Sequence, residues 1–314
     1  MPGEFDFVTE YRQAVPSTTE ASVGQKQRID ELARLIGDYQ AAYYNGEALI
    51  SDSEFDALWD ELKALSPVHP ILTAIGSDAN ATFPKARHII PMGSQEKAAN
   101  PEEFRAWALR QEGDEFLVQH KLDGASLELQ YEAGKLVRAV TRGDGIVGDD
   151  IYSNAIAMQG VLLTLPEPFT GGVRAEVLMS RNIWQEKYRD KANCRNAANG
   201  LMRRKDGLGS EDLSLVVYDL ADYSETGGFA RETEKLHWLE KQGFSVVPHK
   251  LLKGADEVIA FRNALALQRD NLVFDVDGVV VKTLKTNIQD LRRQRPEFQI
   301  AIKFESEQAI SILK

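Results

Sequence analysis

Three lysines stand next to apolar or strand-forming segments, where an unpaired charge is unstable. Lys121, Lys282 and Lys303 each follow such a segment directly in the 314-residue chain. A lysine in these surroundings must pair with an anion or lose its proton, and a neutral amine is a nucleophile. The three positions therefore predict either cations at strand ends or a site that reacts with a negatively charged ligand.

Arginines, glycines and carboxylates accompany these lysines. The segment 141–150 holds Arg142 and three glycines, which allow the backbone to approach a phosphate closely. Glu176 interrupts an apolar run, and Arg195 and Arg203 stand among small residues. Each feature alone is typical of a surface loop or a strand end. Together they predict a pocket for a phosphorylated ligand.

Hydrophobic periodicity predicts two helices in the N-terminal part. Apolar residues recur at helical spacing from residue 25 to residue 43, and Asn45-Gly46 interrupts the pattern. Ser51 or Asp52 caps a second amphipathic helix, which ends before Pro67.

From about Arg87 onward, strand and helix patterns follow one another in irregular order. Period-two alternation predicts strands, with a hairpin turn at Glu132–Lys135. The expected strands are 116–120, 127–131, 136–141, 173–179, 213–220, 276–283 and 298–304, and the expected helices are 181–189, 232–242 and 255–269. This order predicts an α+β protein, in which a small helical domain precedes antiparallel sheets flanked by helices.

The charge distribution separates an acidic N-terminal part from a nearly balanced body. Residues 1–85 hold 14 Asp or Glu against 6 Lys or Arg, whereas the remaining residues hold 34 against 31. We expect a flexible segment at 1–24, a helical domain at 25–85 and a larger domain at 86–314, with a linker near 76–87.

Composition excludes several classes of protein. Cys194 is the only cysteine, which excludes an internal disulfide framework and a cysteine zinc cluster and favours a cytoplasmic location. No apolar run in the sequence has the length of a membrane span, and the N-terminus lacks a signal-peptide pattern. The net charge of −11 argues against nucleic-acid binding over the whole surface.

The series of segments resembles the nucleotidyltransferase superfamily of DNA ligases and capping enzymes, and specifically its NAD-dependent bacterial DNA ligases. The resemblance covers about residues 25–304 and implies a nucleotidyltransferase fold for the larger domain. Six segments carry it in the family's order: Lys121–Gly124 (motif I), Thr141–Asp150 (the glycine-rich arginine segment), Glu176 (motif III), Asn193–Arg203, Asp277–Lys282 (motif IV) and Lys303 (motif V). One such segment is unspecific, whereas six in order are very specific.

The N-terminal helices resemble the small domain that only the NAD-dependent branch possesses. In that branch the domain binds the nicotinamide mononucleotide (NMN) half of NAD. By resemblance Tyr43 and Tyr44 contact nicotinamide, and Asp52, Phe55 and Asp56 contact the same nucleotide. Aromatic faces and carboxylates suit a flat cationic ring. Without the other segments, the aromatic residues would indicate only the core of a helix pair.

The resemblance implies that Lys121 attacks NAD in the presence of Mg²⁺, forming lysyl-AMP and releasing NMN. Neighbouring cations would favour the neutral amine that this attack needs. The implied catalytic residues are Lys121, Asp123, Lys282 and Lys303. The implied NAD-binding residues are Tyr43, Tyr44, Asp52, Phe55, Asp56, Ser94, Gln95, Gln119, Lys121, Arg142, Glu176, Arg195, Arg203, Asp277, Lys282 and Lys303. No dedicated metal cage is expected.

The sequence departs from the family pattern at several of these positions. Gln119 stands where family members carry a glutamate that reads adenine, so adenine recognition is expected to differ. Gln95 replaces an apolar residue, Phe55 replaces a tyrosine, and Cys194 replaces the proline of the family's Asn-Pro-Arg-Asn-Ala-Ala segment. Near Lys303, the family's Trp and Tyr are absent.

The chain ends 11 residues after Lys303, where the family's further domains would follow. We therefore expect self-adenylation by a monomer, and transfer of AMP to the 5′-phosphate of nicked double-stranded DNA only with those domains or a partner chain. No membrane partner is expected. Two alternatives remain open: an ATP-using RNA ligase or capping-type enzyme, and a nucleotide-binding regulatory or split-ligase subunit.

Overall fold

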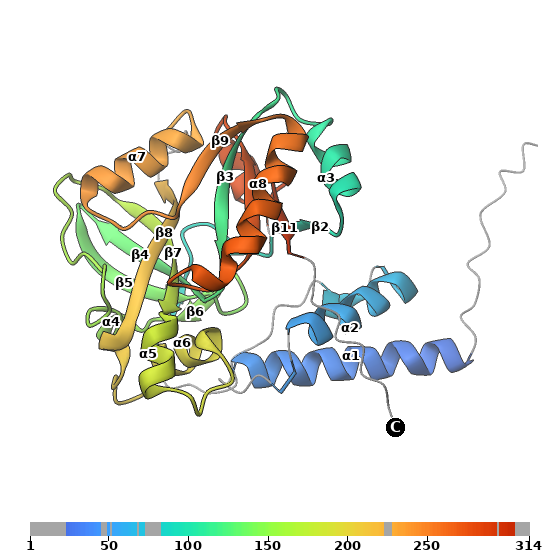
Figure 1. Cartoon of the computed structure of the whole chain (residues 1–314). Helices are drawn as coiled ribbons and strands as arrows, with labels where there is room; N and C mark the ends of the chain where they lie inside the picture. The colour runs from blue at the N-terminus through green and yellow to red at the C-terminus, as the bar shows by residue number, and fades with distance from the viewer. Residues whose placement is uncertain are drawn as a thin grey trace, which may run out of the picture.

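The computed structural model describes residues 23–44, 49–50, 52–67, 69–72, 83–222, 228–293 and 295–304 (Figure 1). Within these ranges the chain forms a helix pair and a larger body built around two main sheets. The predicted α+β class is confirmed, since helices flank sheets whose neighbouring strands are almost all antiparallel. No helix within the described ranges is long and apolar enough to span a membrane.

The helix pair consists of α1 (Val23–Tyr44) and α2 (Asp52–Leu65), followed by the 3₁₀ turn η1 (Pro70–Leu72). Their shared core contains Leu32, Ile36, Leu62 and Leu72, which the helical spacing places on facing stripes. Arg28 on α1 donates two hydrogen bonds of 2.8 Å to the carboxylate of Glu61 on α2. Both predicted helices are confirmed.

The five-stranded sheet has the order β2-β11-β10-β3-β9. Its strands are β2 (Glu96–Ala98), β3 (Glu115–Leu122), β9 (His249–Lys253), β10 (Val276–Thr283) and β11 (Gln299–Lys303). One face packs against α3 (Pro101–Ala108) and α8 (Gly254–Gln268), around Phe104, Phe116 and Val279. Because side chains alternate along a strand, Gln119, Lys121 and Lys282 point to the opposite face.

The four-stranded sheet is antiparallel throughout, with the order β5-β4-β7-β8. Its strands are β4 (Ala125–Glu132), β5 (Lys135–Thr141), β7 (Gly171–Met179) and β8 (Leu213–Asp222). One face packs with α6 (Cys194–Met202) and α7 (Glu232–Gln242) in the largest core of the molecule. The predicted hairpin joins β4 to β5, where Ala133 and Gly134 both have positive φ.

A short two-stranded sheet joins the segment before β2 to the rest of the larger body. β1 (Lys85–Arg87) pairs with β6 (Val147–Asp149), and Lys85 forms an ion pair of 2.8 Å with Asp149. The expected domain boundary after residue 85 therefore falls inside a strand. The expected linker lies partly outside the described residues, as does most of the expected flexible segment.

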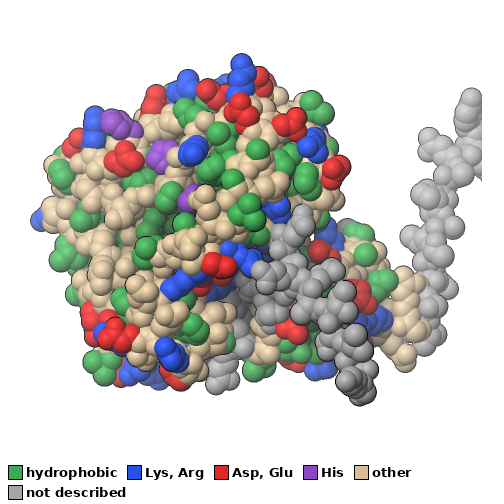
Figure 2. Space-filling model, viewed as in Figure 1, with side chains coloured by type: hydrophobic (Ala, Val, Ile, Leu, Met, Phe, Trp, Pro, Cys, Tyr) green, Lys and Arg blue, Asp and Glu red, His purple; other side chains and the backbone are tan. Residues whose placement is uncertain are grey.

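The remaining elements are short. They are α4 (Tyr152–Ala155), α5 (Arg181–Lys187), α9 (Ile288–Leu291), η2 (Ser210–Asp212) and η3 (Arg269–Asn271). Figure 2 shows charged side chains of both signs interspersed over the face in view.

Candidate active site

A cleft of about 1370 Å³ lies where the two main sheets face each other and the helix pair approaches them. β3, β10 and β11 contribute residues from one side, and β4, β7 and β8 from the other. The segment 92–99 and residues of both N-terminal helices complete the lining. Most of the predicted site residues therefore converge on one cavity, although they are spread over two sheets.

Lys121, Asp277 and Lys303 form a charged group in the cleft. The ammonium of Lys121 lies 2.9 and 3.0 Å from the two carboxylate oxygens of Asp277. Lys303 lies 3.6 Å from the same carboxylate. The side chains of Lys121 and Asp277 keep 22% and 21% of their surface exposed, so a ligand in the cleft can reach them. Two cations thus flank one anion, which leaves positive charge for a phosphate.

Glycines make this arrangement sterically feasible. A Cβ atom at Gly124 would lie 2.3 Å from the backbone oxygen of Val177, and one at Gly278 would lie 2.2 Å from that of Ile302. These close approaches bring β4 against β7 and β10 against β11. The Asp-Gly pairs after Lys121 and before Val279 are therefore required for strand contact, not for a loose turn.

Glu176 is a half-buried residue on the opposite side of the cleft. Burial raises its pKa from 4.5 to about 7, against the opposing influence of Arg195 and Lys121 and of a hydrogen bond from Ser126. That hydrogen bond from the Ser126 hydroxyl is 3.0 Å long. Arg195, on α6, donates to Asp123 at 2.9 Å. Glu176 can thus change its ionisation near neutral pH.

Lys282 lies in a buried ring of alternating charges. Its ammonium donates to Asp219 at 2.8 Å and to Glu232 at 3.2 Å. Lys235, on α7, contacts the other oxygens of the same two carboxylates at 3.0 and 2.7 Å. The exposed fractions of the four side chains range from 1% to 7%. The pKa of Lys282 is raised, because the two carboxylates outweigh the cost of burial.

A β-bulge in β8 explains how an acidic residue reaches this ring. Arg174 of β7 is opposite Asp219, whereas the next residue, Ala175, is opposite Val217. Tyr218 is therefore the extra residue of the strand. The bulge allows both Tyr218 and Asp219 to line the cleft, while Val217 stays in the core.

Gln119 is buried on β3, with 2% of its surface exposed. Its amide nitrogen donates to the backbone oxygen of Tyr218 at 3.0 Å. With the amide oriented in this way, its oxygen is the group left to accept a hydrogen bond in the cleft.

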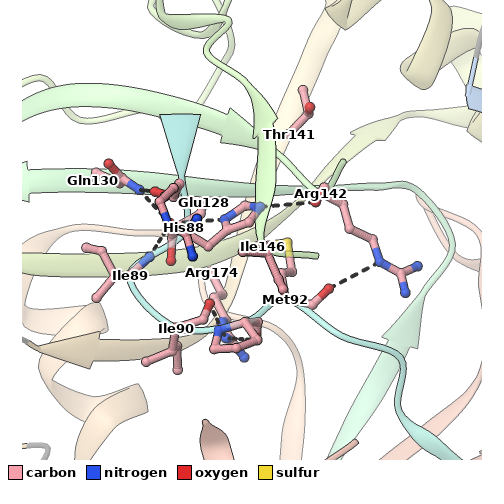
Figure 3. A network of polar contacts seen from close by, with 12 residues as sticks. His88, Ile89, Ile90, Met92, Glu128, Gln130, Thr141, Arg142, Ile146 and Arg174 are labelled. Carbon is pink, nitrogen blue, oxygen red and sulfur yellow. Dashed lines mark hydrogen bonds and ion pairs between the residues drawn. The ribbon is translucent and has the colours of Figure 1, made fainter. Parts of the chain in front are cut away.

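A network of polar contacts fixes the segment 88–94 on the four-stranded sheet (Figure 3). The two ring nitrogens of His88 lie 3.1 Å from Glu128 and 3.1 Å from the backbone oxygen of Arg142. Glu128 also accepts from the backbone nitrogen of Ile89 at 3.2 Å and from Gln130 at 2.8 Å. The network therefore joins this segment to the loop that begins at Arg142.

Arginines continue the network toward the cleft. Arg174 donates to the backbone oxygens of Ile90 and Pro91 at 3.2 and 2.6 Å. Arg142 donates to the backbone oxygen of Met92 at 3.3 Å and to the hydroxyl of Ser94 at 2.9 Å. Ser94 and Gln95 are thereby held at the rim of the cleft.

We expect Glu128→Ala to lower the free energy of unfolding by about 3 kcal/mol, because His88, the backbone nitrogen of Ile89 and the amide of Gln130 all lose the carboxylate that they contact. Glu132→Ala on the same strand is the control, since Glu132 is exposed and should change stability by less than about 0.5 kcal/mol. Urea unfolding of the two variants provides the measurement. Equal stability of both would mean that the network contributes nothing.

The structure brings together most of the residues predicted for the site. The predicted residues that line the cleft are Phe55, Ser94, Gln95, Gln119, Lys121, Asp123, Arg142, Glu176, Arg195, Asp277, Lys282 and Lys303. Arg203 follows the last residue of α6 and does not line it. The side chains of Tyr43, Tyr44, Asp52 and Asp56 lie outside the described residues. The roles of all these residues stay predictions.

Sequence reasoning missed several residues of the cleft. Tyr39 and Trp59 line it, one helical turn from Tyr43 and Phe55, so the spacing alone could have indicated them. Asp219 also lines it, and its place within an apolar strand was a signal comparable to that of Glu176. Lys235 carried no such signal, because a Glu-Lys pair three residues apart is common on exposed helices and its other partner, Asp219, is 16 positions away.

Cys194 is buried near Asp275 at the start of α6. Burial and the neighbouring carboxylate of Asp275 raise the pKa of its thiol to about 12. The thiol is therefore protonated and unreactive at neutral pH.

The described residues contain no group of three or more His, Cys, Asp or Glu side chains that could hold a metal ion. The carboxylates nearest Lys121, those of Asp123 and Asp277, already contact cations. These residues do not fit a metal site built by the protein alone.

Comparisons with known proteins divide the chain into two matching regions. Residues 80–307 match the family model described as NAD-dependent DNA ligase adenylation domain. Residues 22–79 match the model described as DNA ligase-like, N-terminal NAD⁺-binding domain.

Curated relatives extend over nearly the whole chain. A DNA ligase of Treponema denticola is 47% identical over 307 residues, which cover 93% of this chain and 48% of that protein. A DNA ligase of Treponema pallidum is 48% identical over 303 residues, covering 92% of this chain and 37% of that protein. A DNA ligase of Sorangium cellulosum is 34% identical over 325 residues, covering 94% and 48%. The chain thus spans about half the length of these relatives, or less.

Proposed function

Because the chain belongs to the NAD-dependent DNA ligase family, with the N-terminal NAD⁺-binding domain and the adenylation domain of that family, we propose that it transfers AMP from NAD to Lys121. The observation that supports this proposal most strongly is the position of Lys121. Its amine lies beside Asp277 in a cleft large enough for a dinucleotide, and Glu176 lines the same cleft. The product is a lysyl-AMP intermediate.

The proposed step exchanges one bond for another. The neutral amine of Lys121 attacks the phosphorus of the AMP half of NAD, and a nitrogen–phosphorus bond forms. The bond from that phosphorus to the bridging oxygen breaks, and NMN leaves with the oxygen and its electron pair. The amine proton passes to solvent or to Asp277, which lies 2.9 Å away.

Charged neighbours of Lys121 would assist this step. Lys303 would stabilise negative charge on the phosphate. Asp123 would be oriented by Arg195, which donates to it at 2.9 Å. Glu176 would accept a hydrogen bond from a ribose hydroxyl. Arg142 would bind a phosphate from the rim of the cleft.

The helix pair would hold the NMN half of NAD. Phe55 and Trp59 line the cleft from α2, with ring centroids 5.9 Å apart, and offer aromatic surface to a nicotinamide ring. Tyr43, Tyr44, Asp52 and Asp56 would contribute to the same contact, by their resemblance to the family pattern.

Mg²⁺ would enter bound to the phosphates of NAD, because the described residues lack a cage for it. It would offset negative charge on those phosphates. No residue of the chain is assigned to it.

Incubation with NAD and Mg²⁺, followed by intact-mass spectrometry, tests the proposal. We expect a mass gain of one AMP with NAD and none with ATP, since the helix pair matches a family model described as NAD⁺-binding. A gain with ATP only would favour the RNA ligase or capping-type alternative. The absence of any gain, after removal of AMP carried over from expression, would favour a nucleotide-binding subunit.

We also propose that the AMP on Lys121 is destined for the 5′-phosphate of nicked double-stranded DNA. The relatives are named DNA ligases, which supports this step. The matched region covers 48% of each of these two relatives, so about half of their length lies outside it. Mixing the adenylated chain with nicked DNA, with and without the remaining half of a relative, tests it. We expect transfer to the nick only when that half is supplied.

A further inference from the structure

The charged ring around Lys282 is a closed cycle of four ion pairs. Asp219 and Glu232 each use one oxygen for Lys282 and the other for Lys235. The cycle joins three elements, since Asp219 lies on β8, Lys282 on β10, and Glu232 and Lys235 on the first turn of α7. Two carboxylates and two ammonium groups leave the ring without net charge.

Burial of such a ring is costly unless every charge is compensated. Lys235 has 1% of its side chain exposed and lies outside the cleft lining, whereas Lys282 and Asp219 line the cleft. A lone ammonium or carboxylate at these positions would be strongly destabilising. Lys282 is therefore held by two carboxylates, and each of these carboxylates is also paired with Lys235.

The geometry leaves one donor of Lys282 for a ligand. An ammonium has three N–H groups, and within the described part of the chain two of them are given to Asp219 and Glu232. Gln299 lies opposite Lys282 on β11, Gln119 lies opposite Val280 on β3, and both glutamines line the cleft. The third N–H can thus point toward a bound nucleotide at this end of the cleft.

We propose that Lys235 is a positioning residue, which by sharing Asp219 and Glu232 with Lys282 keeps the third N–H of Lys282 available to the adenylate half of NAD. The inference rests on the proposed use of NAD. The acceptor on the ligand is a ring nitrogen of the base or an oxygen of the phosphate. Without Lys235, both carboxylates would draw the Lys282 ammonium inward and occupy its donors.

Three variants of α7 distinguish the effect of the ring's charge balance from a general loss of stability. Lys235→Met leaves the ring with an excess negative charge. The double variant E232Q/K235M restores neutrality with one carboxylate for Lys282, and Lys235→Arg keeps the cation. Lys241→Met, on an exposed position of the same helix, is the control.

Single-turnover formation of lysyl-AMP over a range of NAD concentrations gives the first readout. We expect Lys235→Met to raise the half-saturating NAD concentration about tenfold, in the range of one charge-assisted hydrogen bond, with the maximal rate within about threefold of the wild type. For the double variant and for Lys235→Arg, we expect a half-saturating NAD concentration within about threefold of the wild-type value. Lys241→Met should leave both quantities unchanged.

A second ligand tests one of these acceptors. Nicotinamide hypoxanthine dinucleotide carries a hydrogen on N1 of the base, which is an acceptor in adenine. If Lys282 donates to N1, Lys235→Met will not weaken binding of this analogue further. If Lys282 donates to another ring nitrogen or to phosphate, Lys235→Met will weaken both dinucleotides equally.

Calorimetric titration with NAD without Mg²⁺ separates this inference from the proposed function, because it needs no chemistry. A wild type that binds NAD but never forms lysyl-AMP would contradict the proposed function and leave the binding comparison intact. Unchanged NAD binding in folded Lys235→Met would overturn the inference. If Lys235→Met does not fold, a folded double variant that binds NAD tenfold more weakly than the wild type would overturn it equally.

Discussion

Replacement of Lys121 by arginine is expected to abolish the mass gain of one AMP, lowering the rate more than about a thousandfold, while NAD binding persists. Arginine keeps the positive charge opposite Asp277, which lies 2.9 Å from the lysine ammonium. It cannot act as the nucleophile, because its guanidinium does not lose its proton at neutral pH. The substitution therefore removes the proposed reactive group and preserves the local charge.

The matched measurements are intact mass after incubation with NAD and calorimetric NAD binding. Lys121→Ala accompanies the arginine variant and shows how much of any loss is due to charge. We expect both variants to lack the adduct and the arginine variant to bind NAD more tightly than the alanine variant. An adduct that persists in Lys121→Arg would place the nucleophile elsewhere, with Lys303 the next lysine in the same charged group.

Glu176→Gln is expected to become progressively more stable than the wild type as the pH rises from about 5 to about 8. Burial raises the pKa of Glu176 from 4.5 to about 7, so the folded state keeps a proton that the unfolded state has lost between these values. Wild-type stability contributed by this group therefore falls with rising pH across that window. Because glutamine does not titrate, the stability of the Glu176→Gln variant does not fall in this way.

The expected difference between the pH extremes is on the order of 3 kcal/mol, because the pKa shift is about two to three units. Urea unfolding of both proteins at pH 5 and pH 8 provides the measurement, with Glu132→Gln as an exposed control on β4. If the difference in free energy of unfolding between the wild type and Glu176→Gln is the same at pH 5 and pH 8, the raised pKa of Glu176 is contradicted. The same variant should bind NAD more weakly at pH 8, where ionised Glu176 is the better acceptor for ribose.

The fold was largely predictable because its longer elements have clear periodicity. α7 coincides with the predicted 232–242, and β7 and β10 differ from prediction by two residues or fewer. α6 was not predicted as a helix, although Ala197, Ala198 and Leu201 recur at helical spacing in this short segment. These residues form the face that packs on the four-stranded sheet.

The candidate site was predictable in composition but not in its pairings. The positions of Lys121, Glu176 and Lys282 in strand patterns indicated the cleft before the fold was known. Their partners depend on contacts between distant residues: Lys282 and Asp219 are 63 positions apart, and Lys121 and Asp277 are 156 apart. Periodicity describes neighbours along the chain and contains no information on such pairs.

The bulge in β8 makes the length of that strand as important as its composition. Tyr218 is the extra residue that lets Val217 stay in the core while Asp219 enters the charged ring. With Tyr218 kept but the ladder regular, side-chain alternation would turn Asp219 toward the apolar core. A single-residue insertion next to the bulge, which changes the face of the residues after it, would therefore be far more damaging than one in a surface loop.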